Sequence, residues 1–151
     1  MLLTVVEFVN LLCAGVLAGE EFATFYGVGA CIVLLDNEPG IKLRQALIRR
    51  LRVLTPLLFG MAFLSGTAAV LLSANNAGEV FRCAGLVVLI LFISIALGGT
   101  VPINKVVLAW NAASPPEGWR ATIHKWEQLD IARTWSAILA FGLFLANAVL
   151  C

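Results

Sequence analysis

Two adjacent glutamates, Glu20 and Glu21, lie inside an apolar stretch that runs from Leu2 to Leu35. A carboxylate at the depth of a lipid bilayer costs several kcal/mol unless it is paired, protonated or hydrated, so such residues usually serve a site. Neighbouring residues of a helix point about 100° apart, so a bundle interior cannot hold both side chains equally well. Phe25 shares the helical face of Glu21 and is a candidate ligand contact. The alternative is a shifted helix with the pair at the membrane–water interface.

A second set of polar side chains recurs at three- and four-residue steps near the C-terminus. Trp126, Asp130 and Arg133 fall on one helical face, which continues with small and apolar residues. We expect Arg133 to form an ion pair inside the bundle, with Asp130 one turn away and Glu20 or Glu21 as the partner from another helix. The alternative is an interfacial Trp126 and an Arg133 that extends towards the lipid headgroups.

Asn104 ends a third apolar stretch, after the glycine pair at 98–99 and Pro102. These residues loosen the end of a helix, and the Asn104 amide could bind a ligand or an unwound carbonyl. Trp110 follows shortly after, and we expect it to form an aromatic wall together with Trp126.

The composition indicates the elements that must position these residues. The chain has 151 residues, of which 61% are apolar and 13% charged, and its net charge is +1. Soluble domains are about half apolar and about a quarter charged, so this composition excludes a soluble domain, a disordered chain and a nucleic-acid binder. The length suits about four crossings of roughly 20 residues each. We predict one all-α integral membrane four-helix bundle with spans at about 4–35, 53–73, 83–104 and 131–150.

The basic residues predict the orientation. Most lie in the segments 36–52 and 105–130 or at their edges, whereas only Arg82 is expected in the remaining loop, near Asn75–Gly78. The positive-inside rule then places both basic segments in the cytoplasm and both termini outside. We expect a multi-pass protein of the inner or plasma membrane, with the N-terminal stretch retained as a helix.

Metal and cofactor chemistry has little support in the residues. His124 is the single histidine and is expected to be solvated, and the four cysteines show no paired spacing. No cofactor is required by the sequence, although haem or a metal ion stays open. Cys83 and Cys151 both fall at outward ends of spans, and they could form a disulfide if their Cα atoms lie about 4.4–6.8 Å apart.

The order of four short motifs gives a family resemblance. They are Ala18-Gly19-Glu20-Glu21-Phe22, Arg49-Arg50 before Pro56, Val101-Pro102-Ile103-Asn104, and Trp126 through Arg133-Thr134. With these motifs in this order, the chain resembles the DUF1772 family of small four-helix membrane proteins, whose best-known members are anthrone oxygenase-like enzymes. The resemblance implies a membrane oxidoreductase that inserts oxygen into an activated aromatic, with no tightly bound cofactor established. One departure is Asp130, because many relatives have His or Asn there.

Two classes of function follow. In the first, an apolar phenol-like substrate enters from the lipid, Glu20 or Glu21 is the general base, and Asn104 and Arg133 stabilise the oxyanion. In the second, the chain is a non-catalytic membrane subunit or a small-molecule-binding protein whose polar groups fix helix register. Small residues at 15–19 leave a homo-oligomer open, and a transporter has less support. An apolar cavity that reaches either glutamate would favour the enzyme.

Overall fold

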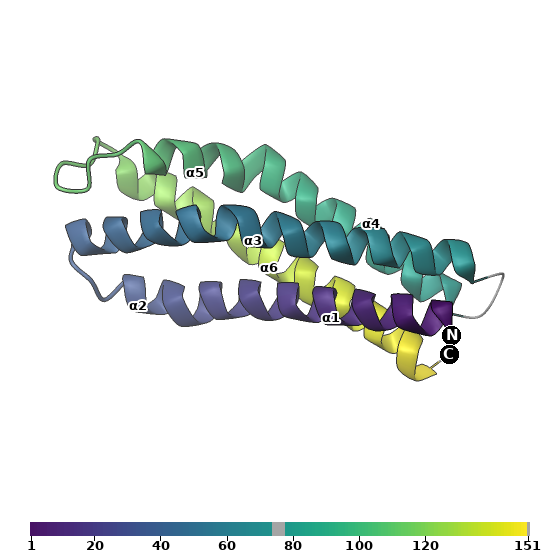
Figure 1. Ribbon diagram of the computed structural model, residues 1–151. Helices are drawn as coiled ribbons and strands as arrows, with labels where there is room; N and C mark the ends of the chain where they lie inside the picture. Colours follow the sequence, from purple (N-terminus) through teal and green to yellow (C-terminus); the bar gives the residue numbers. More distant parts are fainter. Residues whose placement is uncertain (74–77, 151) are drawn as a thin grey trace.

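The computed structural model describes residues 1–73 and 78–150 and shows four long helices (Figure 1). The elements are α1 (Leu2–Phe22), the π-helix η1 (Ala23–Gly29) and α2 (Ala30–Ile32), then α3 (Asn37–Leu72), then α4 (Glu79–Ile95), the π-helix η2 (Ala96–Thr100) and α5 (Val101–Leu108), and finally α6 (Trp119–Leu150). Each of the four helical segments is long and apolar enough to cross a membrane. The predicted all-α membrane bundle is therefore confirmed, and no strand occurs in the ranges described.

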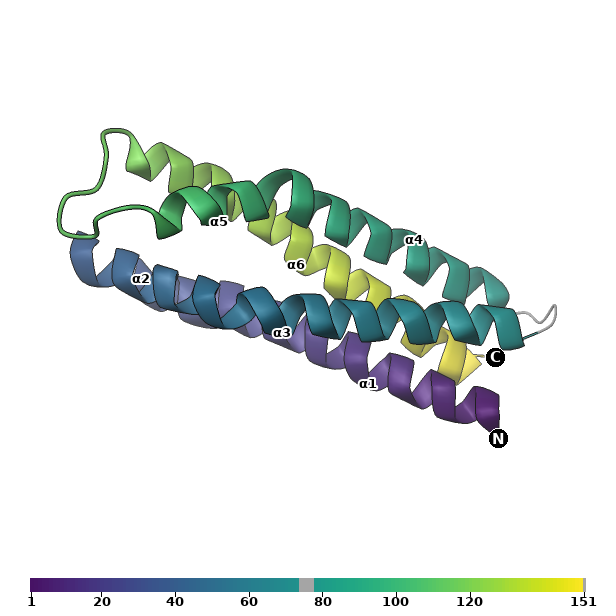
Figure 2. The same cartoon turned by 45° about the horizontal axis from the view of Figure 1, so that its top comes forward.

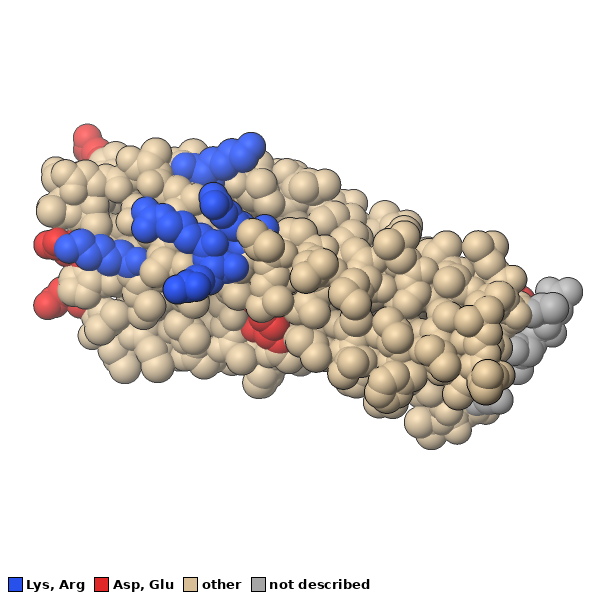
Figure 3. All heavy atoms as spheres, in the orientation of Figure 1, with Lys and Arg blue, Asp and Glu red and all other residues tan. Residues whose placement is uncertain are grey.

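The two ends of the bundle differ in charge. Both termini lie at the end where α3 is followed by α4, and we call this the terminal end (Figures 1 and 2). The connections at 33–36 and 109–118 lie at the opposite end, which we call the basic end. On the face drawn in Figure 3, Lys and Arg side chains gather over the half that holds the basic end. This separation agrees with the charge pattern used above to predict topology.

The first turn between helices begins earlier than the sequence suggested. The turn formers and the proline of residues 36–40 predict a stop there, which is only partly correct, because α3 begins at Asn37 and includes Pro39 in its first turn. A proline is tolerated there because the first backbone N–H groups of a helix have no intrahelical partner. The basic segment continues directly into the second span, as expected, and α3 passes through Pro56 without ending.

Arg82 corrects one expectation. It lies in the first turn of α4 rather than in a loop, and it is buried. Its guanidinium forms an ion pair with Glu7 of α1, and the Nε atom donates to Glu7 Oε1 at 3.2 Å. Asn147 of α6 donates to the same oxygen at 3.2 Å, so three helices meet at the terminal end through one carboxylate. The turn expected at Asn75–Gly78 falls largely outside the described residues.

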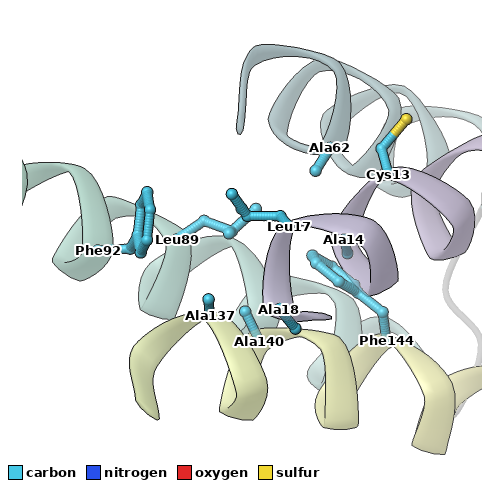
Figure 4. Packing of buried hydrophobic residues seen from close by; sticks show 10 residues of the cluster. All are labelled: Cys13, Ala14, Leu17, Ala18, Ala62, Leu89, Phe92, Ala137, Ala140 and Phe144. Carbon is cyan, nitrogen blue, oxygen red and sulfur yellow. The ribbon is translucent and has the colours of Figure 1, made fainter. Parts of the chain in front are cut away.

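The hydrophobic core of the bundle is made mainly of small residues. Ala14 and Leu17 of α1 meet Ala137, Ala140 and Phe144 of α6, with α3 and α4 completing the cluster (Figure 4). The small residues allow the helices to approach closely. The cluster consists of Cys13, Ala14, Leu17, Ala18, Ala62, Leu89, Phe92, Ala137, Ala140 and Phe144. The helix face predicted from the periodicity of α6 is thus the face that is buried.

Candidate ligand-binding cavity

A cavity of about 740 Å³ lies in the half of the bundle towards the basic end. Its walls come from η1, α2, α3, α4, η2, α5 and α6, so all four helical segments contribute to it. Most of the lining is apolar, and it includes Phe25, Phe59 and Phe92. Cavities that bind small molecules usually measure about 300–1,000 Å³ and have apolar walls with a few polar groups. This cavity has both properties.

Arg133 is the polar centre of the cavity wall. It extends from α6, and its side chain is only 13% exposed. Its Nε atom donates to Glu21 Oε2 at 3.0 Å, and its Nη1 atom donates to Thr100 Oγ1 at 3.2 Å. Asp130 Oδ1 lies 2.7 Å from Arg133 Nη2. The predicted pairing of Arg133 with both Asp130 and a glutamate of the first helix is present.

Two carboxylate oxygens of this group are buried without a hydrogen-bond partner. Glu21 Oε1 is buried and has no hydrogen-bond partner. Asp130 Oδ1 also accepts no hydrogen bond, because its short contact with Arg133 is an ion pair without hydrogen-bond alignment. Buried polar atoms normally find a partner, and these two oxygens are exceptions beside the Arg133 guanidinium. Of the two residues, Asp130 lines the cavity and Glu21 does not.

Glu20 points to a different environment from Glu21, as the helical angle between them predicts. Its two oxygens accept hydrogen bonds from Thr24 at 3.4 Å and from Thr55 at 3.2 Å. Both threonines line the cavity, but Glu20 itself does not. The cavity therefore reaches neither glutamate, so the observation named above as favouring the enzyme is absent and the predicted contact of Glu20 or Glu21 with a substrate is not supported. Asp130 and Glu127 are its lining carboxylates.

Asn104 lines the cavity and is held by Trp126. The Trp126 Nε1 atom donates to Asn104 Oδ1 at 2.7 Å, which leaves the Asn104 amide nitrogen free to donate elsewhere. The guanidinium carbon of Arg44 lies 4.8 Å from the centre of the Trp126 ring, and Arg44 Nη2 donates to Glu127 Oε1 at 3.1 Å. These contacts connect α3, α5 and α6 at the basic side of the cavity.

Both π-helical segments border the cavity. η1 contributes Thr24 and Phe25, and η2 contributes Ala96 and Leu97. Thr100 is the last residue of η2, and its hydroxyl accepts a hydrogen bond from Arg133. The same hydroxyl lies 3.4 Å from the carbonyl oxygen of Ala96, to which it donates. Short π-helical segments are frequent at functional sites. The glycine pair at 98–99 lies inside η2, so the loosening of the helix that it predicts is a π-helical turn.

Other expected site residues lie elsewhere. Trp110 does not line the cavity but packs near Ile48 and Val107, so the predicted aromatic wall with Trp126 is wrong. His124 is exposed and lies 3.2 Å from Gln128, as expected for a solvated histidine. Cys83 is exposed and free, whereas the disulfide predicted with Cys151 falls outside the described residues.

The sequence reasoning did not assign a site role to Arg44, Thr55 or Thr100. In the sequence, Arg44 belongs to a basic segment, but in the structure its side chain is only 8% exposed and contacts Trp126. Its helical spacing from Ile41 and Ile48, both buried, was a signal that it faces inward. No sequence pattern indicates that the two threonines belong to the site, because their contacts depend on which helices are neighbours.

Comparison with known proteins does not extend this description. No family model, no curated protein and no solved structure matches the chain. Within residues 1–73 and 78–150, no three His, Cys, Asp or Glu side chains are arranged to hold a metal ion. The site is therefore interpreted from its own geometry.

Proposed function

We propose that the protein is a membrane-embedded oxidoreductase that binds an apolar, phenol-like aromatic molecule in the cavity and oxidises it with molecular oxygen. The single observation that carries the proposal is the cavity of about 740 Å³, whose apolar walls hold Asn104, Asp130 and Arg133. The basic end faces the cytoplasm of an inner or plasma membrane in this proposal, which is supported by the distribution of Lys and Arg.

The substrate would be an aromatic molecule with an activated CH₂ group. Asp130 takes the role of general base, because it lines the cavity and Glu20 and Glu21 do not. Loss of the proton gives a carbanion conjugated with an oxyanion. This carbanion adds O₂ and, with a proton, forms a hydroperoxide. Loss of water from the hydroperoxide gives the ketone, so one oxygen atom enters the product and the other leaves as water.

Arg133 and Asn104 stabilise the oxyanion in this scheme. Arg133 brings a positive charge to the cavity wall, and the Asn104 amide nitrogen is free to donate because its oxygen accepts from Trp126. Donors that are fixed before the reaction stabilise developing charge effectively in a water-poor site. Glu21 has no contact with substrate here, and its role is to hold the Arg133 guanidinium in position.

A second candidate is a small-molecule-binding subunit without turnover. The observation that favours it is that Arg133 already has two carboxylate partners and a hydroxyl partner, which would fix helix register without any reaction. The resemblance in motif order to anthrone oxygenase-like proteins supports the enzyme instead.

Incubation of the purified protein with anthrone under ¹⁸O₂ separates these candidates. The enzyme proposal predicts that the protein accelerates formation of a ketone product carrying one ¹⁸O atom, and that Asp130→Asn removes this acceleration. Glu38→Gln is a matched control, since Glu38 is exposed, pairs with Lys42 and does not line the cavity. Anthrone oxidises slowly by itself, so the rate is compared with protein-free nanodiscs. Binding without any increase in rate would favour the subunit.

A further inference from the structure

Two of the cations that line the cavity have no ion-pair partner in the described residues. Six charged residues line the cavity, namely Arg44, Arg52, Lys105, Glu127, Asp130 and Arg133. Four form two ion pairs, since Arg44 contacts Glu127 at 3.1 Å and Arg133 contacts Asp130 at 2.7 Å. In the part of the chain that the structure describes, Arg52 and Lys105 have no carboxylate partner. Arg52 and Lys105 are therefore the two lining cations without an ion-pair partner, whereas Arg133 also pairs with Glu21 behind the wall.

These two cations come from neighbouring helices. Gln45 of α3 donates to the backbone oxygens of Val107 and Trp110 at 2.9 and 3.0 Å, which fixes α3 beside the end of α5. From this contact, Arg52 lies about 10 Å along α3, at a rise of about 1.5 Å per residue, and Lys105 lies about 3 Å along α5. Both are displaced in the direction of the terminal end, because α3 and α5 run in opposite directions (Figure 2). Their long side chains can thus reach one group at the cavity.

Arg52 of α3 and Lys105 of α5 differ from Arg49 and Arg50, two further exposed basic residues of α3. Arg52 and Lys105 are exposed at the surface, yet both contribute to the cavity lining. Arg49 and Arg50 are also exposed, but neither lines the cavity. A role limited to membrane orientation needs only positive charge near the headgroups, and it does not require that two unpaired cations border a cavity.

We infer that the cavity selects an anionic aromatic molecule, whose carboxylate lies between Arg52 and Lys105 while its ring system occupies the apolar interior. This inference rests on the proposed function, for which it names the substrate class. An ionised group bound by Arg and Lys forms charge-assisted hydrogen bonds, which are about twice as strong as neutral ones. An anionic phospholipid has the same chemistry, with a phosphate at the cations and an acyl chain in the cavity.

The test compares 2-naphthoate with 2-naphthamide, which share a ring system and differ in charge. Binding to the full chain in phosphatidylcholine nanodiscs is measured by energy transfer from tryptophan, with protein-free nanodiscs as the partition control. We expect wild type to bind the acid about tenfold more tightly than the amide. Arg52→Gln combined with Lys105→Gln should remove this preference, so that the acid and the amide bind equally. Arg49→Gln combined with Arg50→Gln, which changes net charge equally, should retain it.

The outcomes separate this inference from the proposed function. Equal binding of acid and amide, or equal loss of preference in both double variants, would overturn the inference while leaving an aromatic site in place. Failure of both probes to bind would overturn the inference and the proposed function together. Addition of phosphatidylglycerol identifies the source of the anion. If it displaces naphthoate from wild type, the anion is a lipid headgroup, and if it has no effect, the anion is a free acid.

Discussion

The carboxylate of Glu21 and the guanidinium of Arg133 meet at 3.0 Å across the bundle, although 112 residues separate them in the sequence. Glu21 is 1% exposed, so its carboxylate is shielded from bulk water and from lipid headgroups. The contact joins α1 to α6, and Thr100 connects the same guanidinium to η2. This pair fixes the polar wall of the cavity.

Removal of Arg133 should destabilise the protein much more than neutralisation of Glu21. Arg133→Ala leaves two buried carboxylates without their cation, for which a loss of about 3–5 kcal/mol is expected. Glu21→Gln leaves a neutral amide, which costs less to bury, and Arg133 keeps Asp130. Thermal unfolding in detergent measures both. Lys42→Ala, which removes an exposed ion pair, is the control and should change stability by less than about 1 kcal/mol. Equal losses for Arg133→Ala and Lys42→Ala would contradict the buried pair.

Asn104 and Trp126 should be energetically coupled. A double-mutant cycle with Asn104→Ala and Trp126→Phe removes the 2.7 Å hydrogen bond from either side. Because the bond joins α5 to α6 in a partly buried site, a coupling energy of about 0.5–1.5 kcal/mol in unfolding is expected. Trp119→Phe paired with Asn104→Ala is the control cycle, since Trp119 makes no hydrogen bond to Asn104 in the described structure. Additive effects in the first cycle would show that the bond does not form.

Gly85 lies so close to the ring of Phe144 that a side chain at this position should clash. A Cβ atom there would lie 2.6 Å from Phe144 Cε1, and the ring is itself buried in the core. We expect Gly85→Ala to cost about 1–3 kcal/mol by overpacking between α4 and α6. At Gly142 a Cβ atom meets nothing within 4 Å, so Gly142→Ala should be neutral or stabilising. Similar melting temperatures for the two variants would contradict this packing.

The orientation is tested by labelling from outside the cell. In a background without the native cysteines, a cysteine at position 113 lies in the connection at the basic end. One at position 76 lies in the connection between α3 and α4. We expect an impermeant maleimide to label position 76 and not position 113 in intact cells, and to label both after lysis. The reverse pattern would place the basic end outside.

Much of the fold could be predicted because it depends on local patterns. The four apolar stretches and the inward face of α6 follow from hydrophobicity and helical period, which each segment shows by itself. The angle between Glu20 and Glu21 also follows from one helix, and only Glu21 is fully buried. The cavity could not be predicted, because its wall depends on how far neighbouring helices separate. Whether Trp110 or Arg44 faces it depends on the register of α3 against α5.

The position of a bound ligand tests the central claim most directly. A crystal structure of the full chain with 6-bromo-2-naphthol, recorded at the bromine absorption edge, locates the bromine independently of the protein density. We predict an anomalous peak inside the cavity among Phe25, Phe59 and Phe92, with the naphthol oxygen within hydrogen-bond distance of Asp130, Arg133 or Asn104. Bromine peaks confined to the lipid-facing surface, with side chains or acyl chains filling the cavity, would contradict the proposed site.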